Sequence, residues 1–208
     1  MTGRTRAAAA AACAAMLASG SAAAQPLPAE PWEFNVAASA YIFEDDDDYV
    51  QPTIAADRGP LHLEARFNYE DRDTGSAWAG YNLSAGEELL LEFTPMLGVV
   101  FGNTTGVAPG FKGSLSWRNL TLYSETEYVF DADDSGDSYL YTWSELTVAP
   151  GENCRAGLVV QRTKVFETEF DIQRGLLAGF SWKRLDVTAH VFNPDDAPTV
   201  VVAVGGSF

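Results

Sequence analysis

The sequence lacks long hydrophobic runs, basic charge and a cysteine framework. Only 13 of its 208 residues are Lys or Arg, against 29 Asp or Glu, which gives a net charge of −16. This charge argues against nucleic acid as a partner, because an acidic chain repels phosphate. Beyond the amino terminus no run of about 18 apolar residues occurs, so no mature transmembrane helix is expected. A hydrophobic content of 47% nevertheless excludes a disordered acidic chain.

Cysteine is almost absent. Of the two cysteines, Cys13 lies in the amino-terminal segment that we interpret below as an export signal, which leaves only Cys154 afterwards. An exported domain with a single thiol has no internal disulfide, so this fold must hold through backbone pairing and packing.

The first 24 residues have the pattern of an export signal. Arg4 and Arg6 form a basic start, an Ala-rich apolar stretch follows, and small residues come before the expected cleavage point. We therefore expect residues 1–24 to be a signal peptide, residues 25–31 a Pro-rich periplasmic tether, and residues 32–208 the folded domain.

In the rest of the chain, apolar and polar residues alternate with a period of two. Between Leu61 and Glu70, one face carries Leu, Leu, Ala, Phe and Tyr, and the other carries His, Glu, Arg, Asn and Glu. This alternation indicates strands with one apolar face, and connections of hairpin length favour sequential antiparallel pairing. Twelve segments follow the pattern: 32–43, 49–57, 60–70, 74–84, 87–101, 106–117, 119–130, 138–149, 153–163, 172–182, 185–193 and 197–208.

Two architectures bury one face of such strands, a soluble β-sandwich and a membrane β-barrel. The connections alternate in character, and this favours the barrel. The acidic connections 44–48, 70–73, 131–137 and 194–196 all occupy alternate positions along the chain, whereas the connections between them are tighter. A barrel with both termini in the periplasm would place the acidic connections outside the cell, and a sandwich gives no reason for the alternation.

Aromatic residues gather near the ends of the segments, where the interfacial girdles of a membrane barrel lie. These residues are Trp32, Tyr41, Phe43, Tyr49, Tyr69, Phe101, Trp117, Phe130, Tyr139, Trp182, Phe192 and Phe208.

The sequence thus predicts an all-β fold, a single up-and-down antiparallel transmembrane β-barrel of about twelve strands with short loops. Three prolines, Pro52, Pro95 and Pro109, lie inside the predicted strands. A closed barrel has no free edge that would tolerate a missing backbone donor. A barrel of ten strands is therefore the alternative.

The chain ends in a strand that alternates Val202 and Val204 with small residues and closes on Phe208. This ending resembles the carboxy-terminal signal of Gram-negative outer-membrane β-barrels, a terminal Phe preceded by apolar residues at alternating positions. Gly206 departs from the pattern, because the family usually has a larger residue there. The resemblance implies recognition by the barrel-assembly machinery and insertion into the bacterial outer membrane, among its lipids and lipopolysaccharide. It leaves the oligomeric state open.

The polar faces supply the residues of the predicted interior. A twelve-stranded barrel is wide enough for a narrow channel, so we expect passive diffusion of small hydrophilic solutes. The alternative is a closed structural barrel in which the charges pair. The candidate lumen-lining residues are His62, Glu64, Arg66, Glu92, Lys112, Glu125, Glu127, Glu145, Arg155, Asp186 and His190.

The strand from 138 to 149 decides where Glu145 points. Glu145 shares a face with three aromatic residues, and a charge that faces lipid at mid-depth is costly. We expect Glu145 to point inward, opposite Arg155. Arg162 would then face outward near the rim of the membrane.

An outer-membrane lipid- or lipopolysaccharide-modifying enzyme is the other class of function. Such an enzyme needs a His with a Ser or carboxylate partner. His62 stands near Glu64 and His190 near Asp186, but a buried hydrogen-bonded network explains both pairs more simply. No nucleophile elbow and no His-Glu-x-x-His motif occurs, so the sequence favours a protein without catalytic activity.

Two acidic loops, Asp45–Asp48 and Asp131–Asp137, offer carboxylates of the kind that bind calcium or magnesium. The second loop lacks the Glu that closes a calcium-binding loop at its twelfth position. Solvated loops that keep the strand ends out of lipid are the simpler interpretation, and we expect no other cofactor.

Overall fold

A computed structural model describes residues 30–44, 47–165, 171–195 and 197–208. The expected signal peptide and all of the tether except its last two residues lie outside the described residues. The described chain from Pro31 onward is one compact unit.

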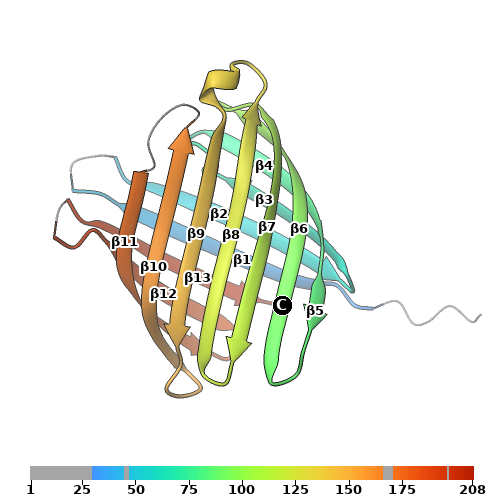
Figure 1. Cartoon of the computed structure of the whole chain (residues 1–208), viewed down its shortest axis with the longest axis vertical. Helices are drawn as coiled ribbons and strands as arrows, with labels where there is room; N and C mark the ends of the chain where they lie inside the picture. The colour runs from blue at the N-terminus through green and yellow to red at the C-terminus, as the bar shows by residue number, and fades with distance from the viewer. Residues whose placement is uncertain (1–29, 45–46, 166–170, 196) are drawn as a thin grey trace, which may run out of the picture. The chain divides into compact units, whose positions relative to one another are not determined.

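This unit is a closed antiparallel β-barrel, in which neighbouring strands of the sequence pair, except that β4 pairs with β6, and β1 pairs with β13 (Figure 1). β5 pairs with β6 just beyond the end of β4, so β4 and β5 together occupy one position in the wall. The barrel therefore has the predicted twelve strands and one short additional segment. The strands are β1 (Glu33–Ile42), β2 (Tyr49–Arg58), β3 (Leu61–Phe67), β4 (Thr74–Tyr81), β5 (Leu83–Ala85), β6 (Leu89–Gly102), β7 (Gly106–Trp117), β8 (Leu120–Asp131), β9 (Tyr139–Val148), β10 (Cys154–Val165), β11 (Asp171–Trp182), β12 (Leu185–Phe192) and β13 (Thr199–Ser207).

The three prolines that made ten strands an alternative lie where the ladder is interrupted on one side. Pro95 falls between the stretch of β6 that pairs with β4 and the stretch that pairs with β5. Pro109 falls in a gap of the β7–β8 pairing, and Pro52 lies just past the end of the β2–β3 pairing. A missing backbone donor costs little at such places. The alternative of ten strands is therefore wrong.

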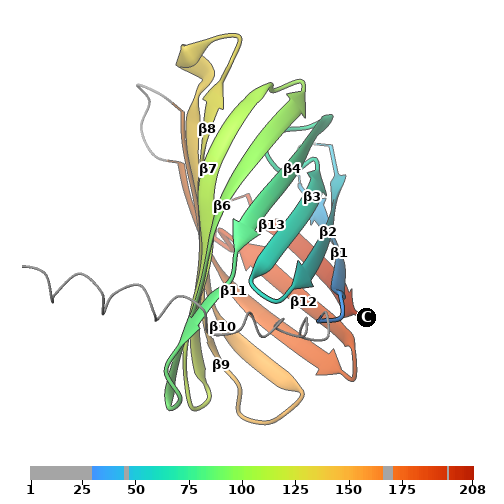
Figure 2. The same ribbon diagram turned by 90° about the vertical axis from the view of Figure 1, so that its right-hand side faces the viewer.

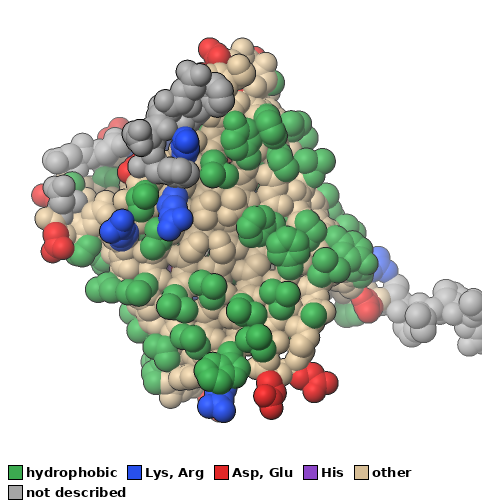
Figure 3. Space-filling view, viewed as in Figure 1, with side chains coloured by type: hydrophobic (Ala, Val, Ile, Leu, Met, Phe, Trp, Pro, Cys, Tyr) green, Lys and Arg blue, Asp and Glu red, His purple; other side chains and the backbone are tan. Residues whose placement is uncertain are grey.

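The outward face of the barrel is apolar. Along β3 the burial alternates strictly, with Leu61, Leu63 and Phe67 exposed on the side away from the interior. Exposed large hydrophobic residues occur on the strands all around the wall, such as Leu97 at 62% and Leu176 at 59% exposure. Figure 3 shows hydrophobic side chains spread over one outer face. Such a surface suits lipid and not water, as in a membrane-embedded barrel.

The two ends of the barrel differ. The connections after β1, β3, β6, β8 and β12 lie at one end, here called the loop end, and the tighter connections lie with both barrel termini at the other, the turn end (Figure 2). A single 3-10 turn, η1 (Ser135–Asp137), lies in the β8–β9 loop. Among the described residues, no helix is long and apolar enough to cross a membrane.

Three outward-facing tryptophans near the turn end each have a basic side chain over the ring, a geometry that favours cation–π attraction. An aromatic ring with a cation beside it is typical of a membrane–water interface. The pairs are Arg58 over Trp32 at 5.7 Å, Arg118 over Trp117 at 4.8 Å, and Lys183 over Trp182 at 4.6 Å.

Candidate functional site: the barrel interior

The interior is built from the residues of each strand that alternate with the apolar outer face. On β3 these residues are His62, Glu64 and Arg66, all buried. By the same alternation the structure places the other candidates on the inner face: Glu92 on β6, Lys112 on β7, Glu125 and Glu127 on β8, Glu145 on β9, Arg155 on β10, and Asp186 and His190 on β12.

On β1 and β13, burial of the inner face increases from the turn end toward the loop end, whereas on β3 His62 is already buried beside the turn end. On β1, Asn35 is exposed and Tyr41 is buried. On β13, Ser207 is exposed and Val201 is 1% exposed. The interior is therefore a funnel that is open at the turn end and narrows along the strands.

A buried arginine crosses the interior. Arg66 on β3 donates from Nη1 to Oε2 of Glu127 on β8 at 2.8 Å, and its Nε donates to Glu64. Its guanidinium also lies 4.1 Å from the ring centre of Tyr69 and 4.6 Å from that of Trp78. Because β3 and β8 are not neighbours in the wall, this side chain ties opposite parts of the barrel together.

Glu64 gathers three nitrogen-bearing side chains. It accepts hydrogen bonds from Arg66 and from Lys112 on β7, and one of its oxygens lies 3.1 Å from Nε2 of His62. The other imidazole nitrogen of His62 lies 2.7 Å from Asp57. The Glu64 side chain is 1% exposed, so its charge depends on these partners.

Glu70 lies just after β3 and is equally buried. Its Oε1 accepts hydrogen bonds from Ser76 at 2.5 Å and from Trp78 at 3.1 Å, and Tyr139 donates to its carbonyl oxygen at 2.5 Å. Its Oε2, like Oε1 of Glu127, is a buried oxygen without a hydrogen-bond partner among the described residues. We call Glu64, Arg66, Glu70, Lys112 and Glu127 the Arg66 cluster.

A layer of large apolar side chains fills the interior beside this cluster. We call this set the aromatic layer: Tyr41, Trp143, Val159, Leu177, Phe192 and Val201, with Phe43, Tyr49, Tyr123 and Tyr141 packed against it.

The aromatic layer corrects part of the expected girdle. Tyr41 and Phe192 are buried inside the barrel, Phe43 and Tyr49 pack against that layer, and Tyr139 packs against a second interior apolar cluster. Tyr41 and Phe192 lie one residue away from outward-facing positions, and the period of two turns them inward. Nearness to a strand end predicts the depth of a side chain along the barrel, but not whether the side chain faces the outside or the interior.

Between the aromatic layer and the turn end, two ion pairs line the interior. Glu145 points inward as expected, but it lies opposite Val159 in the β9–β10 register and its partner is His190, at 2.9 Å. Arg155 instead pairs with both oxygens of Asp186, at 2.6 and 2.7 Å. The expected pairing of Glu145 with Arg155 is therefore wrong, and Asp186 is not the partner of His190.

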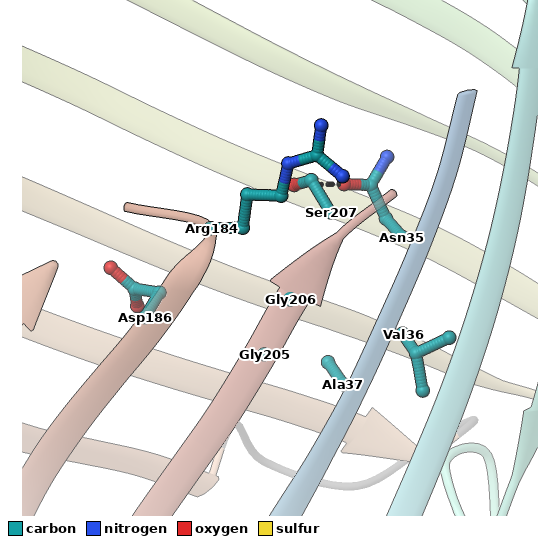
Figure 4. Close-up of a pocket in the computed structure, with 8 residues that line it drawn as sticks. All are labelled: Asn35, Val36, Ala37, Arg184, Asp186, Gly205, Gly206 and Ser207. Atoms are coloured by element: carbon teal, nitrogen blue, oxygen red, sulfur yellow. Dashed lines mark hydrogen bonds between the residues drawn. The ribbon is translucent and has the colours of Figure 1, made fainter. Parts of the chain in front are cut away.

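The wall formed by β10, β11, β13 and β1 carries small inward residues in the same region. Gly179 is one of these residues, and a Cβ there would lie 2.8 Å from the guanidinium carbon of Arg155. The wall ends at the turn end in a cavity of about 220 Å³, lined in part by Asn35, Ala37, Ser207 and Asp186 (Figure 4). The small inward residues are Ala37, Ser39, Gly157, Gly175, Gly179, Ala203 and Gly205.

The two histidines of the described interior pair with carboxylates. Neither the His62 ring nor the His190 ring forms a hydrogen bond with a Ser, Thr or Cys among the described residues. No group of three or more His, Cys, Asp or Glu side chains in the described part of the chain is arranged to hold a metal ion.

The acidic loops use their carboxylates to hold the backbone. In the Asp131–Asp137 loop, Oδ1 of Asp131 accepts hydrogen bonds from the amides of Asp133 and Asp134, at 2.8 and 2.9 Å. Oδ1 of Asp48 accepts from the amide of Phe43 at 3.1 Å, while Asp45 lies outside the described residues. These contacts give Asp131 and Asp48 a structural role in their loops.

Sequence reasoning missed the apolar side chains of the interior. Val201 and Leu177 point inward although the alternation rule reserved that face for polar residues. Both belong to continuous apolar runs, Val200–Val204 and Leu176–Ala178. Such runs are typical of strands that are buried on both faces, and this signal would have placed the aromatic layer.

Comparison with known proteins supports the fold. No model of a known family matches the sequence, and no curated protein does. Among solved structures the chain is similar to KdgM porin, with a TM-score of 0.63 and 12% identity over 84% of this chain and 99% of that one. A second similar structure is KdgM porin in complex with disordered oligogalacturonate, with a TM-score of 0.61, 12% identity and the same coverage. At this identity the likeness shows a shared barrel fold.

Proposed function

We propose that the protein is an outer-membrane channel for the passive diffusion of small hydrophilic solutes. The observation that carries the proposal is the funnel, a polar inner wall that is open at the turn end of a twelve-stranded barrel. Small hydrophilic solutes need such a wall, because each hydrogen bond lost to water must be replaced inside the channel.

The Arg66 cluster and the aromatic layer form the constriction of this channel. Solutes would approach this constriction from the turn end along the small residues of β10, β11, β13 and β1, and the same strands contribute Val159, Leu177, Val201 and Tyr41 to the aromatic layer. Similarity to a porin fold supports this assignment, and the binding of oligogalacturonate is a property of that porin. The solute of the present chain has to follow from its own side chains.

A closed structural barrel is the second candidate, favoured by the same constriction. Arg66 is held by Glu64, Glu127 and two aromatic rings, and it ties strands that are not neighbours. These contacts stabilise a barrel whose lumen stays closed. The two candidates therefore differ in whether the constriction conducts.

Conductance after reconstitution into a planar lipid bilayer tests the proposal. We expect discrete current steps from the purified, folded protein, with a different migration before and after boiling as the check on folding. A flat trace at every voltage from protein that passes this check would refute the channel and leave the structural barrel.

We also propose that the barrel is inserted into the outer membrane by the barrel-assembly machinery, which reads Val202, Val204 and Phe208. Val204 and Phe208 are 42% and 70% exposed on the outer side of the last strand. Their side chains are therefore accessible to a partner that recognises the strand from outside. Outer-membrane lipids and lipopolysaccharide would then surround the apolar belt.

A further inference from the structure

The described interior carries an excess of negative charge. Its cations are Arg66, Lys112 and Arg155, each held by carboxylates, and Arg184, which lines the cavity at the turn end. Eight carboxylates face the lumen or bond into its network, so at least four are not balanced by Lys or Arg. These are Asp57, Glu64, Glu70, Glu92, Glu125, Glu127, Glu145 and Asp186.

The unbalanced carboxylates are held by neutral donors. Glu125 accepts a hydrogen bond from the Tyr123 hydroxyl at 2.7 Å, and Glu92 accepts one from Ser114 at 2.9 Å. Such donors position a carboxylate without cancelling its charge. Glu92 is exposed on the inner face, so its negative charge remains available to a solute.

Two oxygens at the constriction have no hydrogen-bond partner at all among the described residues. Oε2 of Glu70 and Oε1 of Glu127 are both buried, in side chains that are 0% and 5% exposed. A buried carboxylate oxygen without a donor is costly, and a cation that passes nearby would lower this cost through its electric field. This observation does not depend on the charge count. It indicates that a positive charge is favoured at the Arg66 cluster, which forms part of the constriction.

Three of the carboxylates lie on two adjoining strands, on one side of the lumen. Glu125 and Glu127 lie on β8, and Glu145 lies on the adjoining β9, with Tyr123 and Glu145 opposite each other in the register. Together they form an acidic stripe at and below the constriction. On the small-residue wall, Arg155 pairs with both oxygens of Asp186, so its charge is balanced there, and Arg184 lies at the turn end.

We propose that the lumen is selective for cations, so that its solutes are small cationic or neutral hydrophilic molecules, and acidic oligosaccharides are excluded. This inference rests on the proposed channel function. A lumen of one sign concentrates counter-ions and repels ions of like charge, because the low-dielectric wall focuses the field.

The test is the reversal potential of the reconstituted full chain in a gradient of KCl. We expect the sign of a cation-selective pore, with a permeability ratio of potassium to chloride above about 3, since an acidic lumen concentrates cations. Glu127→Gln and Glu145→Gln should each lower this ratio, and Asp133→Asn, in the exposed β8–β9 loop, should leave it unchanged. Glu92→Gln, at the exposed mouth, provides a variant with little risk to folding, and it should also lower the ratio.

The possible failures are distinct. A reversal potential of zero or of the opposite sign would overturn cation selectivity and leave the channel intact. Faster passage of an acidic oligosaccharide than of a neutral one of equal size, measured by swelling of loaded vesicles, would also overturn it. A flat trace from folded protein would remove the channel itself and this inference with it.

Discussion

At the scale of single residues, Arg66 matters most, because it hydrogen-bonds to Glu64 on its own strand and reaches across the lumen to Glu127 on β8. Arg66→Ala leaves these buried carboxylates without their main partner. Breaking a buried ion pair in this way typically costs about 3–5 kcal/mol. We expect a clear fall in the denaturant midpoint of unfolding, measured by intrinsic fluorescence.

The matched control for this prediction is Arg118→Ala, because Arg118 is exposed on a turn and its guanidinium lies over the ring of Trp117. An exposed pair of this kind contributes about 0.5–1 kcal/mol. Equal midpoints for the two variants would contradict a central role for Arg66.

Gly98 gives a second prediction at this scale. A Cβ at this position would lie 2.5 Å from the ring of Trp78, which stacks on Arg66 and donates to Glu70. Gly98→Ala must therefore displace Trp78, and overpacking of this kind costs about 1–3 kcal/mol. We expect a lower unfolding midpoint and a changed tryptophan emission spectrum. Gly113→Ala is the control, because its Cβ would meet no atom closer than 3.5 Å.

At the scale of secondary-structure elements, the strands and their order could be predicted from the sequence. A period of two fixes which residues share a face, and connections of hairpin length leave sequential pairing as the economical topology. The ladder interruptions at Pro52, Pro95 and Pro109 could not be predicted in the same way. They depend on where neighbouring strands end, which is a property of two strands together.

The same limit applies to the interior. The inward direction of Glu64, Arg66 and Glu127 follows from local alternation, but their meeting across the lumen depends on strand tilt and side-chain reach. The pairing of His190 with Glu145 depends on the same two properties. The inward members of the network on the strands could thus be predicted from the sequence, but Glu70, which lies beyond the end of β3, and the pairing of all these residues could not.

The last strand carries a prediction at this scale. Phe208 exchanges backbone hydrogen bonds with Phe34 at the β1–β13 seam, while its ring is 70% exposed. Phe208→Ala keeps the backbone pairing and removes only the exposed ring. We expect it to refold in detergent like the wild type but to be depleted from the outer-membrane fraction of cells. Normal fractionation would remove the assembly role of Phe208, and failure to refold would show that the ring stabilises the fold itself.

At the scale of the whole molecule, the orientation of the barrel in the membrane follows from the contrast between its two ends. Acidic connections gather at the loop end, and basic side chains over Trp32, Trp117 and Trp182 gather at the turn end. Short turns and both barrel termini at the turn end are typical of the periplasmic side of such barrels. We therefore expect the loop end to face the outside of the cell.

Thiol labelling in intact cells tests this orientation. In a Cys154→Ser background, Asp133→Cys places a thiol in the loop after β8, and Glu152→Cys places one in the turn after β9. Both positions are exposed, so the two thiols should differ in their reaction with the label only because they lie on opposite sides of the membrane. A membrane-impermeant maleimide should label the first variant in intact cells and the second only after permeabilisation. The reverse pattern would turn the barrel over and place the open end of the funnel at the cell exterior.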